Sequence, residues 1–129
     1  MSKKIIQAPE GKAPQAIGPY SQGVRVGDLV FLSGQIPTDP ATGAFPEGIA
    51  AQTEQAIKNI TALLAVEGLT LAHVVKASVF MADLAEFAAM NEVYARHFAS
   101  APPARSTFQV AKLPRDARVE IEVVAHAGA

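Results

Sequence analysis

The chain has 129 residues and a formal net charge of −1, and half of its residues are hydrophobic. This length suits one domain, residues 1–129, built around one hydrophobic core. The near-neutral charge argues against a nucleic-acid-binding protein, which usually carries a basic face. The absence of cysteine excludes disulfide bonds, a thiolate nucleophile and a cysteine-ligated metal.

The first residues of the chain do not resemble a targeting signal. Lys3 and Lys4 are followed by no apolar core and no small-residue cleavage site. No apolar run approaches the roughly 20 residues that span a bilayer. The sequence therefore predicts a cytoplasmic protein with no membrane partner.

The first third of the chain is typical of strands. A short strand is expected at residues 4–7, and residues 22–36 are predicted to form a hairpin around Gly27-Asp28. Glycine supplies the positive φ that such a two-residue turn requires. Residues 37–43 contain two prolines and a glycine, and are expected to form a loop.

Helical spacing begins after Gly48. Ile49, Thr53 and Ile57 begin an apolar stripe that continues to Leu64, and Gly68 is suited to the position after the helix end. The polar residues of this segment are expected on the opposite, solvated side: Gln52, Glu54, Gln55, Lys58 and Asn59.

A buried strand is expected at residues 74–81, which are apolar and rich in valine. A second helix should follow, with Asp83 and Glu86 as a capping pair and Pro102-Pro103 after its end. Its buried stripe is predicted to consist of Phe87, Met90, Tyr94 and Phe98.

Two final strands, residues 105–110 and 118–125, complete the pattern. Strands and helices then alternate as β-β-β-α-β-α-β-β. This order predicts an α+β domain with a mixed six-stranded sheet and two helices on one face.

The last two strands carry the polar residues of interest. Side chains alternate between the faces of a strand. If the apolar sides lie under the helices, neighbouring strands present Arg105 and Thr107 together with Arg118, Glu120 and Glu122 on the other face. This pattern is compatible with a solvated face holding an ion pair. It is equally compatible with a guanidinium that binds a carboxylate beside a group that transfers a proton.

Three ordered motifs resemble those of the RidA (YjgF) family of reactive-intermediate deaminases. They are IGPYSQG at residues 17–23, LSGQIP at residues 32–37, and PARSTFQVAKLP at residues 103–114 followed by VEIE at 119–122. Their spacing also fits, so the resemblance covers nearly the whole chain.

The resemblance implies a role for each matching residue. Arg105 corresponds to the arginine that binds the substrate carboxylate, Glu120 to the glutamate that activates water, and Tyr20 to the tyrosine that closes the site. Gly34 and Thr107 correspond to positions that contact the substrate through the backbone.

Two further positions are implied with them. Asn91 corresponds to an asparagine near the pocket, and Ser33, which lies beside Gly34, could add a hydroxyl. Several relatives carry cysteine where this chain has Thr107. If this position contacts the substrate through its backbone carbonyl, threonine should preserve activity, and the hydrolysis needs no thiol, so activity is expected.

The family resemblance implies hydrolysis of 2-imino acids and their enamine tautomers, such as 2-iminobutanoate and 2-iminopropanoate, to 2-keto acids and ammonia. No cofactor is implied, and the three histidines lack the spacing of metal ligands. The implied assembly is a chorismate-mutase-like homotrimer with sites between subunits. Two alternatives are an RNA-acting, translation-inhibiting protein and a non-catalytic ligand-binding or chaperone-like trimer.

Overall fold

The computed structural model describes residues 2–129 and contains one six-stranded mixed sheet. Across the sheet the strands follow the order β1-β2-β3-β6-β4-β5, and only β4 and β5 run parallel to each other. The strands span β1 Lys4–Ile6, β2 Gly23–Val26, β3 Leu29–Leu32, β4 Val74–Met81, β5 Ala104–Gln109 and β6 Val119–His126.

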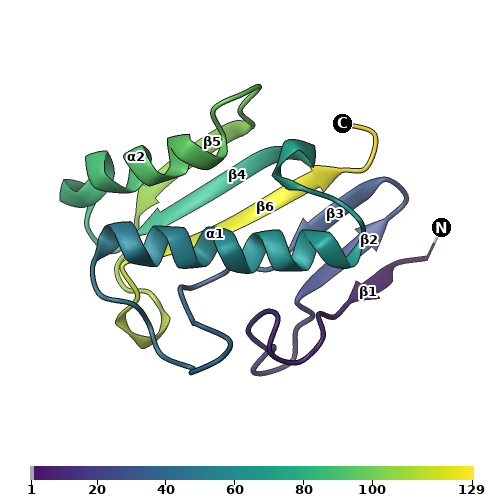
Figure 1. Cartoon of the computed structure of the whole chain (residues 1–129), viewed down its shortest axis with the longest axis horizontal. Coiled ribbons are helices and arrows are strands. Elements are labelled where there is room, and N and C mark those ends of the chain that lie inside the picture. Colours follow the sequence, from purple (N-terminus) through teal and green to yellow (C-terminus); the bar gives the residue numbers. More distant parts are fainter. Residues whose placement is uncertain (1) are drawn as a thin grey trace.

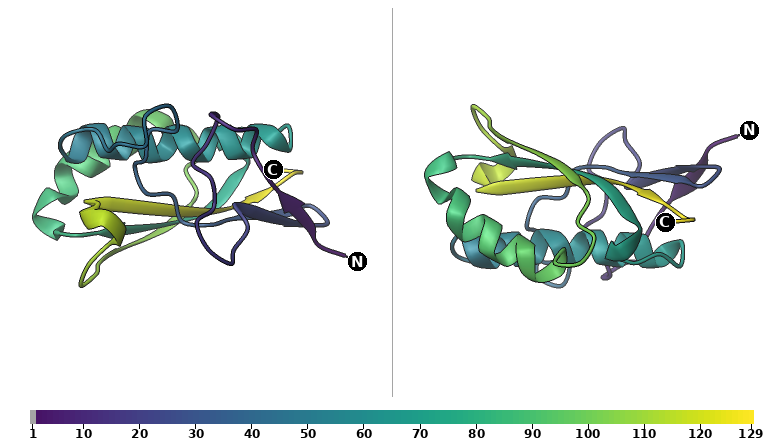
Figure 2. Two further views of the ribbon diagram at one scale, coloured as in Figure 1. Left: turned by 90° about the horizontal axis from the view of Figure 1, so that it is seen from below. Right: turned by 90° about the horizontal axis from the view of Figure 1, so that it is seen from above.

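Two helices, α1 (Ile49–Val66) and α2 (Phe87–His97), cover one face of this sheet and leave the other face bare (Figures 1 and 2). Single 3-10 turns precede β4 (Leu71–His73), α2 (Leu84–Glu86) and β6 (Pro114–Asp116). The predicted α+β architecture, with both helices on one face, is confirmed. Among the described residues, neither helix is long and apolar enough to cross a membrane.

The hydrophobic core lies between the helices and the sheet. Ile57 and Ile60 of α1 are at most 1% exposed, and so are Val79 of β4 and Ile121 of β6. Burying a side chain of this size stabilises the fold by roughly 1.5–3 kcal/mol. The helical stripe predicted from the sequence is therefore the stripe that packs on the sheet.

Two polar residues of α1 are buried, although they were expected on its solvated side. Asn59 donates from Nδ2 to the carbonyls of Ile36 and Thr38, at 3.2 and 2.9 Å. Gln52 accepts from the backbone N–H of Arg118 at 2.9 Å. Each amide satisfies backbone groups of a segment outside the helix, which explains why a polar side chain is buried here.

The hairpin is shorter than the predicted range 22–36, because β3 ends at Leu32. Gln35 instead forms a bridge with Ile121: its N–H donates to the Ile121 carbonyl at 2.8 Å, and its carbonyl accepts from the Ile121 N–H at 3.1 Å. This bridge fixes Ser33 and Gly34 beside the beginning of β6.

The predicted capping pair of the second helix forms only in part. Asp83 accepts from the N–H of Ala85 at 2.8 Å, but it caps the 3-10 turn rather than α2. Glu86 does not turn back to this cap, because its carboxylate binds the guanidinium of Arg118 at 2.7 Å. This ion pair also withdraws Arg118 from the polar face to which the sequence pattern assigned it.

Candidate active site

The two strands that carry the predicted site are not neighbours, because β4 lies between β5 and β6. Arg105 is level with Ala77 of β4, and Thr107 is level with Val79. Ala77 and Val79 are both completely buried on the side of the helices. Residues paired across a sheet point to the same face, so Arg105 and Thr107 face the helices. The prediction that they lie on the bare face is wrong.

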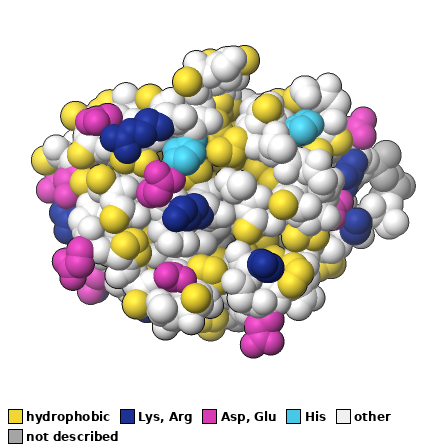
Figure 3. Space-filling model, viewed as in Figure 1, with side chains coloured by type: hydrophobic (Ala, Val, Ile, Leu, Met, Phe, Trp, Pro, Cys, Tyr) yellow, Lys and Arg dark blue, Asp and Glu magenta, His cyan; other side chains and the backbone are white. Residues whose placement is uncertain are grey.

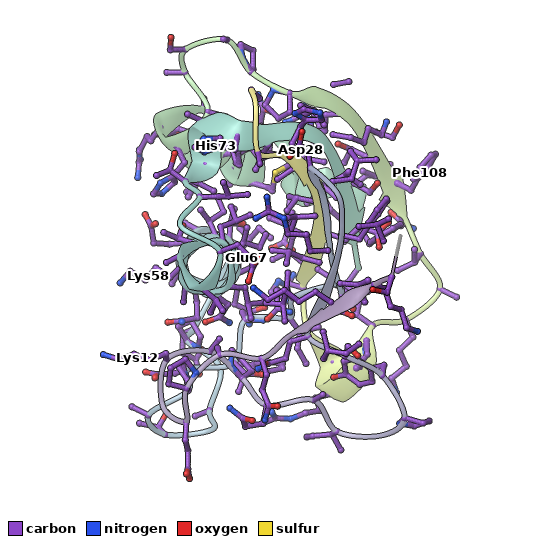
Figure 4. The ribbon with its side chains drawn as sticks, turned by 90° about the vertical axis from the view of Figure 1, so that its right-hand side faces the viewer. Lys12, Asp28, Lys58, Glu67, His73 and Phe108 are labelled. Atoms are coloured by element: carbon purple, nitrogen blue, oxygen red, sulfur yellow. The ribbon has the colours of Figure 1, made fainter. Side chains whose placement is uncertain are left out.

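Glu120 lies on the bare face, as predicted. It is level with Phe80, which is in turn level with Phe108. Phe108 is 55% exposed and points away from the helix layer (Figure 4). Within one chain, Arg105 and Glu120 therefore lie on opposite faces of the sheet.

The error has a physical cause in the last strand of the sheet. The sequence argument required the more apolar side of β5 to lie under the helices, but that side includes the exposed Phe108. The guanidinium of Arg105 is accommodated beneath α2 because it lies over the ring of Tyr94, with Cζ 4.6 Å from the ring centroid. Arginine stacks favourably on aromatic rings and buries its aliphatic stem at little cost.

We call Arg105, Asn91 and Thr107 the arginine half of the candidate site. Nη1 of Arg105 donates to Oδ1 of Asn91 at 2.7 Å, which ties β5 to α2. No carboxylate of residues 2–129 forms an ion pair with this guanidinium. Arg105 therefore retains hydrogen-bond donors for an anion.

Thr107 offers both a hydroxyl and backbone groups to a ligand. Its Oγ1 is buried and has no hydrogen-bond partner within residues 2–129. The N–H of Val110 donates to Met81, so the alternation of a parallel ladder turns the N–H and carbonyl of Thr107 away from β4. Since β5 is the last strand of the sheet, these groups face its open edge.

The four remaining predicted residues, which we call the carboxylate half, line one cavity of about 540 Å³. These residues are Tyr20, Ser33, Gly34 and Glu120, and the cavity is completed by Ile17, Ile36, Pro114 and Arg115. The sequence predictions are thus brought together as two groups, one on each side of the sheet.

Hydrogen bonds hold the loops of the carboxylate half. Oγ of Ser33 donates to the carbonyl of Ser21 at 2.6 Å, and the N–H of Ser33 donates to Gln22 at 2.9 Å. The hydroxyl of Tyr20 accepts from the N–H of Ile17 at 3.3 Å, and its side chain is half exposed. The serine hydroxyl is engaged by the protein, whereas Tyr20 borders the open mouth of the cavity.

Gly34 lies directly against the carboxylate of Glu120. A methyl group added to Gly34 would overlap Oε2 of Glu120 and would lie 2.9 Å from its Cδ. The absence of a side chain at Gly34 therefore allows the carboxylate to lie against the backbone, and it determines the position of the Glu120 carboxylate.

We expect Gly34→Ala to lower kcat by about 10- to 100-fold with little loss of thermal stability. The side chain of Glu120 can rotate away from the added methyl group, which relieves the overlap, but its carboxylate then no longer lies where it activates water. Activity assays and thermal melting measure the two effects. Gly128→Ala is the control, since Gly128 has an ordinary φ and an added methyl group would meet only the ring of His126. An alanine variant at Gly34 with full activity would contradict the assigned position of Glu120.

The environment of Glu120 favours the protonated carboxyl. Burial raises the pKa of Glu120, and the nearby charge of Glu122 raises it further. A carboxylate with a raised pKa is a stronger base when ionised, and it returns the proton more readily at neutral pH than an ordinary glutamate does.

Sequence reasoning missed the aromatic environment of Arg105. The Arg105 Cζ lies 5.6 Å from the ring centroid of Phe87 as well as 4.6 Å from that of Tyr94. Both rings were expected only as core residues. The available signal was Asn91, which stands four residues after Phe87 and three before Tyr94 and so shares their side of the helix.

Arg115 at the cavity rim was also missed. Its Nη2 donates to the carbonyl of Gly43 at 2.8 Å, and its guanidinium lies over the ring of Phe45.

Within residues 2–129, no group of three or more histidine, aspartate or glutamate side chains is placed to hold a metal ion.

Sequence comparison connects the chain with characterised proteins over almost its full length. The family model described as Endoribonuclease L-PSP matches residues 10–127. Protein DfrA of Myxococcus xanthus is 51% identical over 128 residues, which cover 97% of this chain and 96% of that protein. The 2-iminobutanoate/2-iminopropanoate deaminase of Bos taurus is 46% identical over 127 residues, covering 98% of this chain and 91% of that protein.

The fold agrees equally closely with solved structures. E. coli TdcF, with bound serine, superposes with a TM-score of 0.91 at 44% sequence identity, covering 95% of this chain and 98% of that one. The YjgF gene product of E. coli gives the same TM-score, identity and coverage.

Proposed function

The chain belongs to the Endoribonuclease L-PSP family, which includes the Rid (YjgF) proteins, and we propose that it hydrolyses reactive 2-imino acids to 2-keto acids and ammonia. Its relatives include proteins named as deaminases of such intermediates. The proposed substrates are 2-iminobutanoate, 2-iminopropanoate and their enamine tautomers, which are small, anionic and electrophilic at C2.

The observation that carries the proposal is the state of Arg105. Its guanidinium is held by Asn91 and by the ring of Tyr94, yet it has no carboxylate partner within residues 2–129. A fixed guanidinium with free donors is suited to the carboxylate of a small acid. Each charge-assisted hydrogen bond to that carboxylate would contribute about 1.5–3 kcal/mol.

In the proposed reaction, Arg105 binds the substrate carboxylate and the backbone carbonyl of Thr107 orients the imine N–H. Glu120, in its ionised form, takes a proton from water as the water oxygen bonds to C2 of the protonated imine and the electron pair of the C=N π bond moves to nitrogen. The resulting adduct carries a hydroxyl and an amino group on C2. Glu120 then returns the proton to nitrogen, the C–N bond breaks with its electron pair on the leaving ammonia, the hydroxyl proton passes to Glu120 and from there to solvent, and a 2-keto acid is left.

The other residues of the two halves would shape the site. The ring of Tyr20 would cover the substrate at the cavity mouth, and Gly34 would allow the backbone to approach it closely beside Glu120. The Ser33 hydroxyl already donates to Ser21, so its proposed contribution is to hold this loop in place. Water addition to an imine is intrinsically quick, so positioning and general acid–base catalysis of this kind suffice.

We further propose that the two halves meet between subunits of a homotrimer. Four apolar side chains on the bare face of the sheet are 39–55% exposed, namely Ile5, Leu29, Phe31 and Phe108. An exposed apolar sheet face of this kind favours burial against another chain. The arginine half stands at the open edge strand β5, where it could complete the carboxylate half of a neighbouring chain.

The direct test is the hydrolysis of 2-iminobutanoate and 2-iminopropanoate, generated in situ, with and without the protein. Release of 2-keto acid faster than the uncatalysed rate is the expected result. A folded protein that leaves both rates unchanged would contradict the proposed reaction. Binding of a keto acid without turnover would then favour the non-catalytic alternative.

The RNA-acting alternative receives no support from the charge distribution. The chain carries 11 basic and 12 acidic residues. On the face that carries the helices, the two kinds are interspersed rather than gathered into a basic patch (Figure 3). Salt-sensitive binding of RNA by the purified protein would revive this alternative.

A further inference from the structure

We propose that Tyr94 is a positioning residue for the carboxylate anchor, and that the face of its ring holds the guanidinium of Arg105 in the orientation that binds the substrate. This inference rests on the proposed function, because it assigns Arg105 to the substrate carboxylate. It adds a residue that the family motifs in this sequence do not include.

The geometry of α2 places two contacts on the guanidinium of Arg105. Phe87, Asn91, Tyr94 and Phe98 are separated by four, three and four residues, so they form one stripe along the helix. Asn91 fixes the guanidinium from the side through the 2.7 Å hydrogen bond to Nη1. Tyr94 lies beneath it, with its ring centroid 4.6 Å from Cζ. The hydrogen bond to Asn91 limits sliding of the guanidinium plane, and the ring of Tyr94 limits its tilt.

Tyr94 is itself held in place by its packing. Its side chain is 5% exposed, and its ring stacks on Phe98 with centroids 4.5 Å apart and an interplanar angle of 28°. A ring fixed in this way can hold a flexible arginine side chain without losing much entropy itself. Holding the guanidinium before the ligand arrives reduces the cost of binding.

The hydroxyl of Tyr94 takes no part in the contact with Arg105. Oη of Tyr94 is buried and has no hydrogen-bond partner within residues 2–129. Burial raises the pKa of Tyr94, although the charge of Arg105 opposes this effect. The side chain thus remains a neutral phenol, and its contact with Arg105 is made through the ring.

The experiment compares Tyr94→Leu and Tyr94→Met, which remove the ring, with Tyr94→Phe, which removes only the hydroxyl. Binding of 2-oxobutanoate is measured by calorimetry, and turnover of 2-iminobutanoate gives kcat and KM. We expect Leu and Met to raise both Kd and KM about tenfold while kcat changes less than about twofold, as loss of a cation–π contact predicts. Tyr94→Phe, which keeps the ring, should leave Kd and KM within about twofold of the wild-type values.

Val93→Ala is the matched control. It truncates the buried side chain next to Tyr94 in α2, but Val93 is neither one of the two rings that lie near Arg105 nor part of the stack of Tyr94 on Phe98. We expect it to lower the melting temperature as Tyr94→Leu does while leaving Kd and KM unchanged.

Three results would overturn the inference: equal effects of Tyr94→Leu and Val93→Ala on Kd, a Tyr94→Phe variant as weak as Tyr94→Leu, or a wild type that binds no 2-oxobutanoate. A wild type that binds 2-oxobutanoate without hydrolysing the imine would refute the proposed reaction. The Kd series would still decide the role of Tyr94.

Discussion

Arg105→Ala should reduce kcat/KM for 2-iminobutanoate by at least about 100-fold, because the substrate loses two or more charge-assisted hydrogen bonds to its carboxylate. The same change should weaken binding of 2-oxobutanoate by a comparable factor. Hydrolysis kinetics and calorimetry measure the two losses. The fold should persist, because Arg105 makes no ion pair within residues 2–129 that its removal would break.

Arg96→Ala is the control for this variant, since it also removes one positive charge, but Arg96 pairs, within residues 2–129, only with Glu92 on the exposed surface of α2. It should leave kcat and KM unchanged. Arg105→Lys should recover only part of the activity, because an ammonium group cannot bind a carboxylate through two parallel donors. Unchanged turnover of Arg105→Ala would refute the anchor and, with it, the arginine half of the site.

Glu120→Gln should lower kcat by about 100- to 10,000-fold, the range expected for loss of a general base, with little change in the affinity for 2-oxobutanoate. Glutamine keeps the size and shape of the side chain but cannot accept the proton from water. A variant that loses affinity instead of kcat would show that Glu120 acts structurally. Glu122→Gln, two residues along the same face of β6, should retain activity.

The raised pKa of Glu120 makes two further results follow from these variants. Wild-type activity should rise with pH through the raised pKa of Glu120. Glu122→Gln should shift this rise to lower pH, because the charge of Glu122 contributes to the raised pKa.

Folding disfavours the ionised form of Glu120. The wild type should therefore lose stability relative to Glu120→Gln as the pH increases from below about 4.3, the value for an unfolded glutamate, through the raised pKa of the folded chain. Melting curves at several pH values test this.

Much of the fold could be predicted from periodicity. The strand at residues 74–81 has the predicted bounds, and α1 ends before Gly68, whose φ of +71° suits the position after a helix. Strand order could not be predicted, because alternation within a strand identifies residues that share a face but not which strand lies beside it. The insertion of β4 between β5 and β6 is a property of the whole sheet.

The candidate site was predicted as a set of residues, but its arrangement was not. The resemblance to the family implied all seven positions, six of them within its motifs and Asn91 outside them, but the alternation argument placed Arg105 and Glu120 on one face. Hydrophobicity predicted the wrong face of β5 to lie under the helices. The ring of Tyr94 in α2 packs favourably against a guanidinium, so the charged Arg105 can face the helix layer. The buried amides of Gln52 and Asn59 eluded prediction for a related reason, since the loops that they bind are distant in sequence.

The most direct test of the account is complementation between two inactive variants, Arg105→Ala and Glu120→Gln, produced together in one cell at equal levels. If each site joins the arginine half of one chain to the carboxylate half of the next, about a quarter (½ × ½) of the sites contain both intact residues. We expect the mixture to regain about a quarter of wild-type turnover of 2-iminobutanoate, whereas each variant alone remains inactive. A mixture no more active than its separate components would contradict a site shared between subunits.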